Sequence, residues 1–137
     1  MMHHKLKLAL RWLLAAFFIL AGWNHFRDPA LYLSMMPPYL PKPELLNIIS
    51  GLGEIAGGIG VLIPRFRRPA AWGLIALLVA IFPANLHLAI NGWSGRNLAS
   101  WILWARLPFQ LLFIGWVYWT CLAKLSTIPT ARPLHEN

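Results

Sequence analysis

Four long apolar stretches are the feature that most limits what this chain can fold into. They cover residues 6–26, 45–63, 70–90 and 98–122, and prolines or polar residues separate them. A helix rises 1.5 Å per residue, so about 20 apolar residues cross the roughly 30 Å hydrocarbon core of a bilayer. No stretch alternates with period two, which argues against a β-barrel. The sequence therefore predicts an all-α polytopic membrane protein: an antiparallel bundle of four transmembrane helices, followed by a short polar cytoplasmic tail at 123–137.

The composition excludes most soluble functions. Only 12% of the residues are charged, whereas a soluble domain carries about a quarter. The net charge of +8 would indicate nucleic acid in a soluble protein, but in an apolar chain a basic excess more often reports membrane topology. The single cysteine, Cys121, rules out an internal disulfide and a CxxC redox pair. We expect membrane lipid as a partner, and no nucleic acid.

The basic residues predict the orientation of the four spans. Eight of them lie at the N-terminus, in the 64–69 loop and in the tail, whereas three lie in the 27–44 and 91–97 loops. Basic residues collect in cytoplasmic loops, so we expect both termini to be cytoplasmic. The two groups are Lys5, Lys7, Arg11, Arg65, Arg67, Arg68, Lys124 and Arg132 on the inner side, and Arg27, Lys42 and Arg96 on the outer side.

The first outer loop, 27–44, has a structure of its own. Asp28 followed by Pro29 is typical of a helix N-cap and its first helical position, so the apolar segment 31–36 is predicted to form a short surface helix. The proline-rich segment 37–43 is stiff and extended. The loop can be interpreted as a lid over the outer end of the bundle or as a rigid tether between two helices.

Apart from Lys7 and Arg11, which can extend to the inner interface, the strongly polar side chains of the spans lie at mid-membrane or in the outer half. Each ionisable group there costs roughly 2.5–3.5 kcal/mol on insertion scales, so it needs a partner or a purpose. Counting 1.5 Å per residue, Glu54 lies about 15 Å deep and Arg106 about 12 Å deep. The candidate ligand-binding or proton-relay residues are His25, Glu54, Asn85, His87, Arg106 and Gln110, with Asn24, Tyr39, Ser50 and Trp104 in support. We expect an aromatic roof of Trp23, Tyr39, Trp101 and Trp104 above them.

Helical spacing predicts which of these groups face each other. One stripe on the second span contains Asn47, Ser50, Gly51, Glu54 and Gly58, and one on the fourth contains Arg106, Gln110, Phe113 and Val117. If the stripes face each other, Glu54 and Arg106 form a salt bridge. This pair is either interhelical glue or part of a functional site. Asn85 and His87 are about 200° apart on an ideal helix, so they line one cavity only if Pro83 distorts the third span.

Several short motifs, in their order and spacing, resemble the DoxX family of small four-helix bacterial membrane proteins. The resemblance implies a location in the inner membrane. Some DoxX relatives are associated with quinone-linked sulfur oxidation or with thiol and oxidative-stress chemistry. The family pattern marks His25, Glu54, Asn85 and Arg106 without assigning roles, and the lack of paired cysteines departs from thiol-redox relatives. The motifs are Gly22-x-x-His25-Phe26, Met36-Pro37-Pro38-Tyr39-Leu40-Pro41, Ser50-Gly51-x-x-Glu54-x-x-x-Gly58-x-x-x-Leu62-Ile63-Pro64, Arg67-Arg68-x-Ala70-Ala71-Trp72, Phe82-Pro83-Ala84-Asn85 and Arg106-Leu107-Pro108-x-Gln110.

Three functions compete on these grounds. The first is a redox-associated accessory subunit that holds a quinone or another small ligand in the outer half, with Glu54 as a proton relay. The second is a purely structural or assembly subunit of a larger membrane complex. The expected partners are such a complex or, alternatively, further copies of this chain. The third, a small-solute transporter, is disfavoured because the inner half offers no polar route and no inverted repeat is evident. The sequence holds no self-contained catalytic motif, and His25 and His87 lack the spacing of a metal site.

Overall fold

The computed structural model describes residues 2–93 and 98–123, and this part of the chain is helical without a strand. Four of its helical segments, Met2–Arg27, Pro43–Leu62, Arg67–Asn91 and Ser100–Leu122, are long and apolar enough to cross a membrane, which confirms the predicted number of spans. The predicted inner-side residues Lys124 and Arg132, the outer-side Arg96 and almost all of the tail lie outside the described residues. The elements are α1 (Met2–Arg27), α2 (Pro29–Met35), α3 (Pro43–Leu62), α4 (Arg67–Asn91), α5 (Ser100–Val117) and the π-helical turn η1 (Tyr118–Leu122).

The short helix α2 begins as the sequence predicts. The side chain of Asp28 accepts a hydrogen bond from the backbone N–H of Leu31 at 3.2 Å, and Pro29 occupies the first turn. This N-cap satisfies one of the donors that a helix start leaves free. The surface helix predicted for the 27–44 loop is therefore present, although it begins and ends slightly earlier than the apolar segment 31–36.

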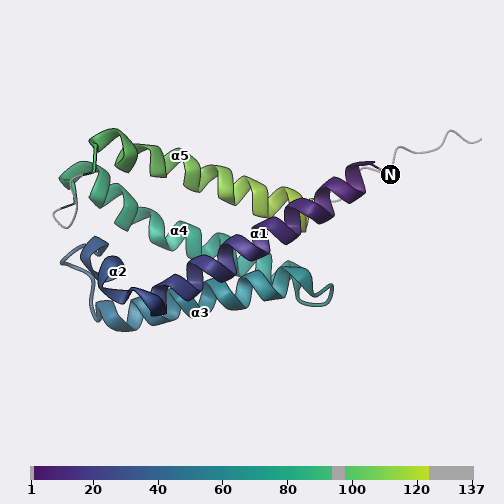
Figure 1. Cartoon of the computed structure of the whole chain (residues 1–137), viewed down its shortest axis with the longest axis horizontal. Coiled ribbons are helices and arrows are strands. Elements are labelled where there is room, and N and C mark those ends of the chain that lie inside the picture. The colour runs from purple at the N-terminus through teal and green to yellow at the C-terminus, as the bar shows by residue number, and fades with distance from the viewer. Residues whose placement is uncertain (1, 94–97, 124–137) are drawn as a thin grey trace, which may run out of the picture.

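The main packing contacts join α1 to α3, α3 to α4 and α4 to α5. In Figure 1, α1 runs diagonally in front of α3, and its N-terminal half reaches the end of α5. Side-chain contacts define two ends of the molecule. At one of them, which we call the α2 end, α2 reaches α1 through Tyr32 and reaches α5 through Met35. At the opposite end, Arg11 of α1 donates to the carbonyl of Thr120 in η1, and Arg67 donates to the carbonyl of Val61. The candidate residues lie toward the α2 end.

The closest helix contact is between α1 and α3, and glycines make it possible. A Cβ atom on Gly22 would lie 2.6 Å from the backbone oxygen of Gly51, and a Cβ on Gly51 would lie 2.8 Å from the Cβ of His25. Farther along, a Cβ on Gly58 would lie 3.0 Å from the backbone oxygen of Ala15. Small residues of this kind let two membrane helices approach until their backbones touch. The face of α3 that contains Gly51 and Gly58 therefore lies against α1.

The apolar core lies on the side of the polar candidate residues that is nearer to the opposite end. Outside the core, many large apolar side chains point outward: Leu20 is 68% exposed and Leu112 is 66% exposed. Apolar surface on this scale is unfavourable in water but compatible with a multi-pass protein in lipid. The core consists of Leu14, Ala15, Phe18, Val61, Ala71, Leu74, Val117 and Cys121.

Candidate functional site

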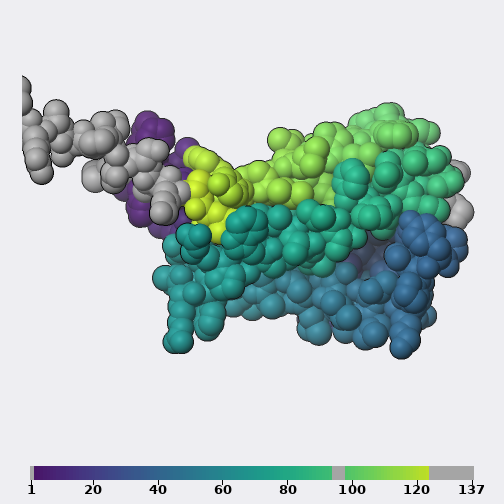
Figure 2. Space-filling view, turned by 180° about the vertical axis from the view of Figure 1, so that it is seen from behind, coloured from purple at the N-terminus to yellow at the C-terminus, as the bar shows by residue number. Residues whose placement is uncertain are grey.

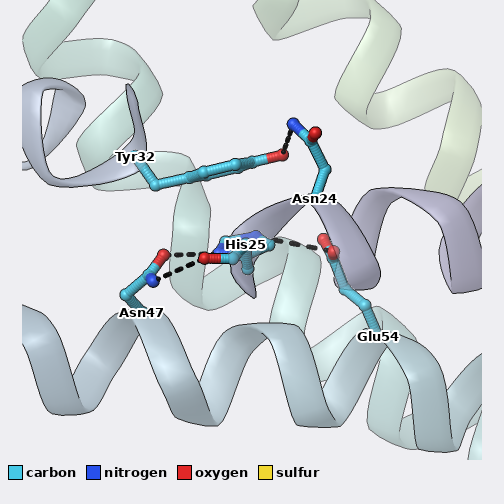
Figure 3. A network of polar contacts seen from close by, with 5 residues as sticks. All are labelled: Asn24, His25, Tyr32, Asn47 and Glu54. Atoms are coloured by element: carbon cyan, nitrogen blue, oxygen red, sulfur yellow. Dashed lines mark hydrogen bonds and ion pairs between the residues drawn. The ribbon is translucent and has the colours of Figure 1, made fainter. Parts of the chain in front are cut away.

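A group of polar side chains surrounds His25 in the last turn of α1 (Figure 3). The ring nitrogen Nδ1 lies 2.6 Å from Oδ1 of Asn47 on α3, and Nδ2 of Asn47 donates to the backbone carbonyl of His25 at 3.0 Å. His25 is 6% exposed and Asn47 is 3% exposed. The two contacts tie the end of α1 to the first half of α3, and they hold the imidazole ring in one orientation.

Glu54 lies on the other side of the same ring, two turns along α3 from Asn47. Its Oε2 atom is 3.5 Å from Nε2 of His25, a distance longer than a formed hydrogen bond. Oε2 is buried and makes no hydrogen bond. Among the described residues, no group of three or more histidine, cysteine or acidic side chains gathers as a metal site would require. The pair His25–Glu54 is therefore a two-group contact between α1 and α3.

Tyr32 of α2 covers the face of the imidazole. The two rings are stacked, with centroids 3.7 Å apart and planes at 25°. The phenol oxygen accepts a hydrogen bond from Nδ2 of Asn24 at 3.1 Å (Figure 3). Asn24 and His25 are neighbours on α1, so α2 folds back over the helix that precedes it. This contact favours interpreting the 27–44 loop as a cover over the site, because a mere tether would not need it.

The predicted salt bridge between Glu54 and Arg106 is wrong. Across residues 2–93 and 98–123, the carboxylate of Glu54 pairs with His25 alone. The reason is the packing order: α3 lies between α1 and α4, and α5 packs against α4. The polar stripe of α3 was predicted correctly as one face, but it faces α1, whereas we expected it to face the fourth span.

Arg106 reaches α2 instead of α3. Its Nη1 atom donates to the sulfur of Met35 at 3.3 Å. The side chain is half-buried. A thioether is a weak acceptor, and a guanidinium carries five N–H donors. Within the described part of the chain no carboxylate pairs with Arg106, so most of its donors are available to a ligand.

Asn85 and Gln110 form a separate contact between α4 and α5. Nδ2 of Asn85 donates to Oε1 of Gln110 at 3.1 Å, and Nε2 of Gln110 donates to the backbone carbonyl of Leu78. Pro83 has no N–H, so the carbonyl of Val79 lacks its usual helical donor. Leu78 is the residue before Val79. Gln110 is 5% exposed. This pair fastens two helices together and does not touch the group around His25.

His87 stands apart from Asn85, as the angle between them on an ideal helix implies. Its ring meets that of Tyr39 edge to face at a centroid distance of 5.6 Å. Nδ2 of Asn91 donates to the backbone carbonyl of His87 at 3.0 Å. Pro83 lies inside α4, but Asn85 and His87 still have different partners. The prediction that both contribute to one site is not supported by these contacts.

The predicted aromatic roof is also wrong in most of its members. Trp23, Trp101 and Trp104 are 61%, 71% and 50% exposed, so they point outward. Indole rings favour the interface between lipid and water, which explains this placement. Tyr39 contacts His87, but the ring that covers the polar group is Tyr32.

Two members of the site were not among the predicted candidates. Asn47 was recognised as part of the α3 stripe, and its depth just inside the span could have singled it out. Tyr32 follows the N-cap Asp28 by one helical turn, so the predicted surface helix already carried it. Ser50, a predicted supporting residue, is half-buried on α3 between Asn47 and Glu54 and makes no side-chain hydrogen bond to any described residue.

The surface is hollowed at the α2 end. Figure 2 shows a recess between α2 and α4, and atoms of α1 lie at its bottom. Two apolar grooves lie elsewhere: one of about 690 Å³ on α5 beside Trp116, and one of about 470 Å³ between α3 and α4 beside Gly53. None of the candidate polar residues lines either groove. The recess between α2 and α4 lies at the α2 end of the molecule, where the polar group around His25 also lies.

One family comparison gave a match. The sequence model of the family described as "Domain of unknown function (DUF8561)" matches residues 14–121. That range contains all the site residues described above. Neither the curated proteins nor the solved structures gave a significant match.

Proposed function

The chain belongs to the DUF8561 family, and for it we propose the function of a redox-associated accessory subunit that binds a small carbonyl-bearing ligand of the quinone class at the α2 end. A bound cofactor or a partner subunit supplies the electrons. The resemblance to the DoxX family is part of this proposal. The residues that carry it include Gly22, His25, Gly51 and Glu54, which lie together where α1 meets α3.

The observation that carries this proposal is the environment of Arg106. A cation inside an apolar helix is costly unless something pairs with it, and Arg106 has only a thioether as a hydrogen-bond acceptor among the described residues. A quinone carbonyl or a small anion would supply the missing acceptor. Tyr32 lies one helical turn before Met35 on α2, and its ring would provide a flat surface beside that ligand.

The ligand proposal requires a defined membrane orientation. We propose an antiparallel bundle in the bacterial inner membrane with both termini in the cytoplasm and the α2 end outside. Six basic residues of the described chain, in the first half of α1 and from the α3–α4 turn into the first turn of α4, lie at the opposite end, as the bias of basic residues toward the cytoplasm requires. Single cysteines at Lys42 or Arg65, in a Cys121→Ser background, would test it. A membrane-impermeant maleimide should label intact spheroplasts only at position 42.

A quinone titration tests the ligand proposal. The purified full-length protein in lipid nanodiscs should bind a short-chain quinone saturably, and Arg106→Ala should weaken that binding at least tenfold. Arg106→Lys should retain part of the affinity, because it keeps the charge but loses the planar fork. Arg27→Ala, which removes an exposed arginine at the same end, should bind as the wild type does. Equal, non-saturable partitioning into all four proteins would refute the proposal.

A second function, a structural subunit of a larger membrane complex, is supported by the contacts of Asn47 and His25. These residues bond α1 to α3 in the buried interior, as interhelical glue would. A gentle purification should then yield a stoichiometric partner, and Asn47→Leu should release it while leaving quinone partitioning unchanged. Recovery of the chain only as a monomer or homo-oligomer would count against this function.

A further inference from the structure

The two contacts of Asn47 fix which nitrogen of His25 carries hydrogen. The amide group of Asn47 donates from Nδ2 to the backbone carbonyl of His25 at 3.0 Å, and a carbonyl can only accept. The amide orientation is therefore set, and it is Oδ1 that faces the ring nitrogen Nδ1 at 2.6 Å. Because Oδ1 is also only an acceptor, Nδ1 must be the donor. In a neutral ring, Nε2 then has a lone pair and no hydrogen.

That lone pair faces a carboxyl group. Nε2 of His25 lies 3.5 Å from Oε2 of Glu54, and both side chains are buried. If Glu54 were ionised and His25 neutral, two acceptors would face each other and a buried charge would have no partner. One additional proton removes this conflict, on either Nε2 or Oε2. In both arrangements the pair has no net charge, which lowers the cost of burying it in a membrane span.

The surroundings of the pair leave access from one side only. Toward the α2 end lie Asn24 and the phenol of Tyr32, and Arg106 contacts Met35 of the same short helix. Toward the opposite end the core begins, with Leu14, Phe18, Val61, Leu74 and Val117. The titratable groups of α4 lie elsewhere: Arg67 and Arg68 are in its first turn, and His87 is beside Tyr39. Among the described residues, the polar groups that adjoin the pair lie toward the α2 end, so we expect a proton to leave the pair in that direction.

We infer that His25 and Glu54 together form a binding site for one exchangeable proton, which is loaded and released at the α2 end and does not cross the protein. Asn47 is the positioning residue, because it holds Nδ1 as a donor and so turns the lone pair of Nε2 toward Glu54. The site needs no ligand, so it stands or falls separately from the quinone proposal.

Titration of the ligand-free protein tests the inference. The full-length protein with ¹⁵N-labelled histidine would be followed by NMR, and the carboxyl stretch of Glu54 by infrared spectroscopy, from acidic to alkaline pH. Substitutions His25→Gln and Glu54→Gln assign the signals, and Glu44→Gln, at an exposed carboxyl in the first turn of α3, is the matched control. Nδ1 should stay protonated throughout. The last proton of the neutral pair should leave in one step that changes the Nε2 signal and the carboxyl stretch at a common midpoint, because the macroscopic steps of a coupled pair belong to both groups.

Two results would overturn the inference in the wild type, where folding is not in question. One is a hydrogen on Nε2 of the neutral ring with none on Nδ1. The other is a pair whose signals share no titration step, with the imidazole responding only at one midpoint and the carboxyl only at another. In Asn47→Leu, checked for helical content by circular dichroism, the common midpoint should split, and an unchanged titration would contradict the positioning role. Proteoliposomes containing the protein should leak protons no faster than empty ones, and Glu54-dependent leakage would contradict one-sided access.

Discussion

The contact between α1 and α3 predicts that adding one methyl group to Gly22 destabilises the protein. The Cβ of Gly22→Ala would lie 2.6 Å from the backbone oxygen of Gly51 and 2.9 Å from the backbone nitrogen of Ile55. Backbone atoms cannot rotate away, so α1 would have to move off α3. Overpacking of this kind costs about 1–3 kcal/mol, and the backbone clash places Gly22→Ala in the upper part of that range.

Gly73→Ala provides the matched control. Gly73 lies inside α4, and nothing lies within 4 Å of an added Cβ there. Alanine is a better helix former than glycine by roughly 0.5–1 kcal/mol, and both variants have this gain. The difference between the two variants therefore isolates the steric cost. Gly57→Ala should fall between them, because its Cβ would meet Cδ2 of Leu74 at 2.4 Å, and that side chain can adjust.

Equilibrium unfolding in mixed micelles, followed by circular dichroism, measures these differences. The expected order of stability is Gly73→Ala above Gly57→Ala above Gly22→Ala, with about 1–3 kcal/mol between the first and the last. The NMR signal of the His25 ring should shift in Gly22→Ala and stay in place in Gly73→Ala, because Gly22 lies one turn before His25. If Gly22→Ala were as stable as Gly73→Ala, the close approach of α1 and α3 would be refuted.

Three further predictions use the same preparations. In double-mutant cycles, the changes in unfolding free energy from substituting Glu54 and Arg106 should add within about 0.5 kcal/mol, whereas those from His25 and Glu54 should show a coupling of roughly 0.5–3 kcal/mol. The reverse pattern would support the ion pair expected from helical spacing. Gln110→Leu should lower the free energy of unfolding by about 0.6–1.7 kcal/mol through lost interhelical hydrogen bonds, and no loss would contradict its bonds to α4. Arg11→Met should speed amide exchange at the end of α5, measured by mass spectrometry, because its guanidinium binds a carbonyl of η1; Arg11→Lys should have a smaller effect.

At the opposite end, two basic side chains of α1 make hydrogen bonds that sequence patterns did not predict. Lys7 is 7% exposed, and its Nζ donates to the backbone carbonyl of Ala123 at 3.0 Å. Arg11 donates to the carbonyl of Thr120 from both Nε and Nη2. The last carbonyls of a helix lack intrahelical donors, and cations near them are favourable. These bonds join residues more than 100 positions apart, so no local pattern could have indicated them.

The sequence by itself determined the features that depend on neighbouring residues. The number of spans follows from the length of each apolar run, and α2 follows from the cap at Asp28. The stripe that contains Asn47 and Glu54 follows from the period of a helix. Each of these is settled within one segment, so the printed sequence contains all that is needed.

Only the tertiary structure decided which helix that stripe faces. Helical spacing gives the direction of a side chain relative to its own axis, but not the identity of the neighbour. The neighbour is selected by close packing between segments: Gly22, Gly51 and Gly58 let α1 approach α3, which leaves α5 to pack on α4. Glu54 consequently lies beside His25. Arg106 lies against α2, where one of its N–H groups donates to the sulfur of Met35. The same residues that suggested a salt bridge thus form two sites, because backbone contact between glycines, and not the attraction of opposite charges, sets the order of the helices.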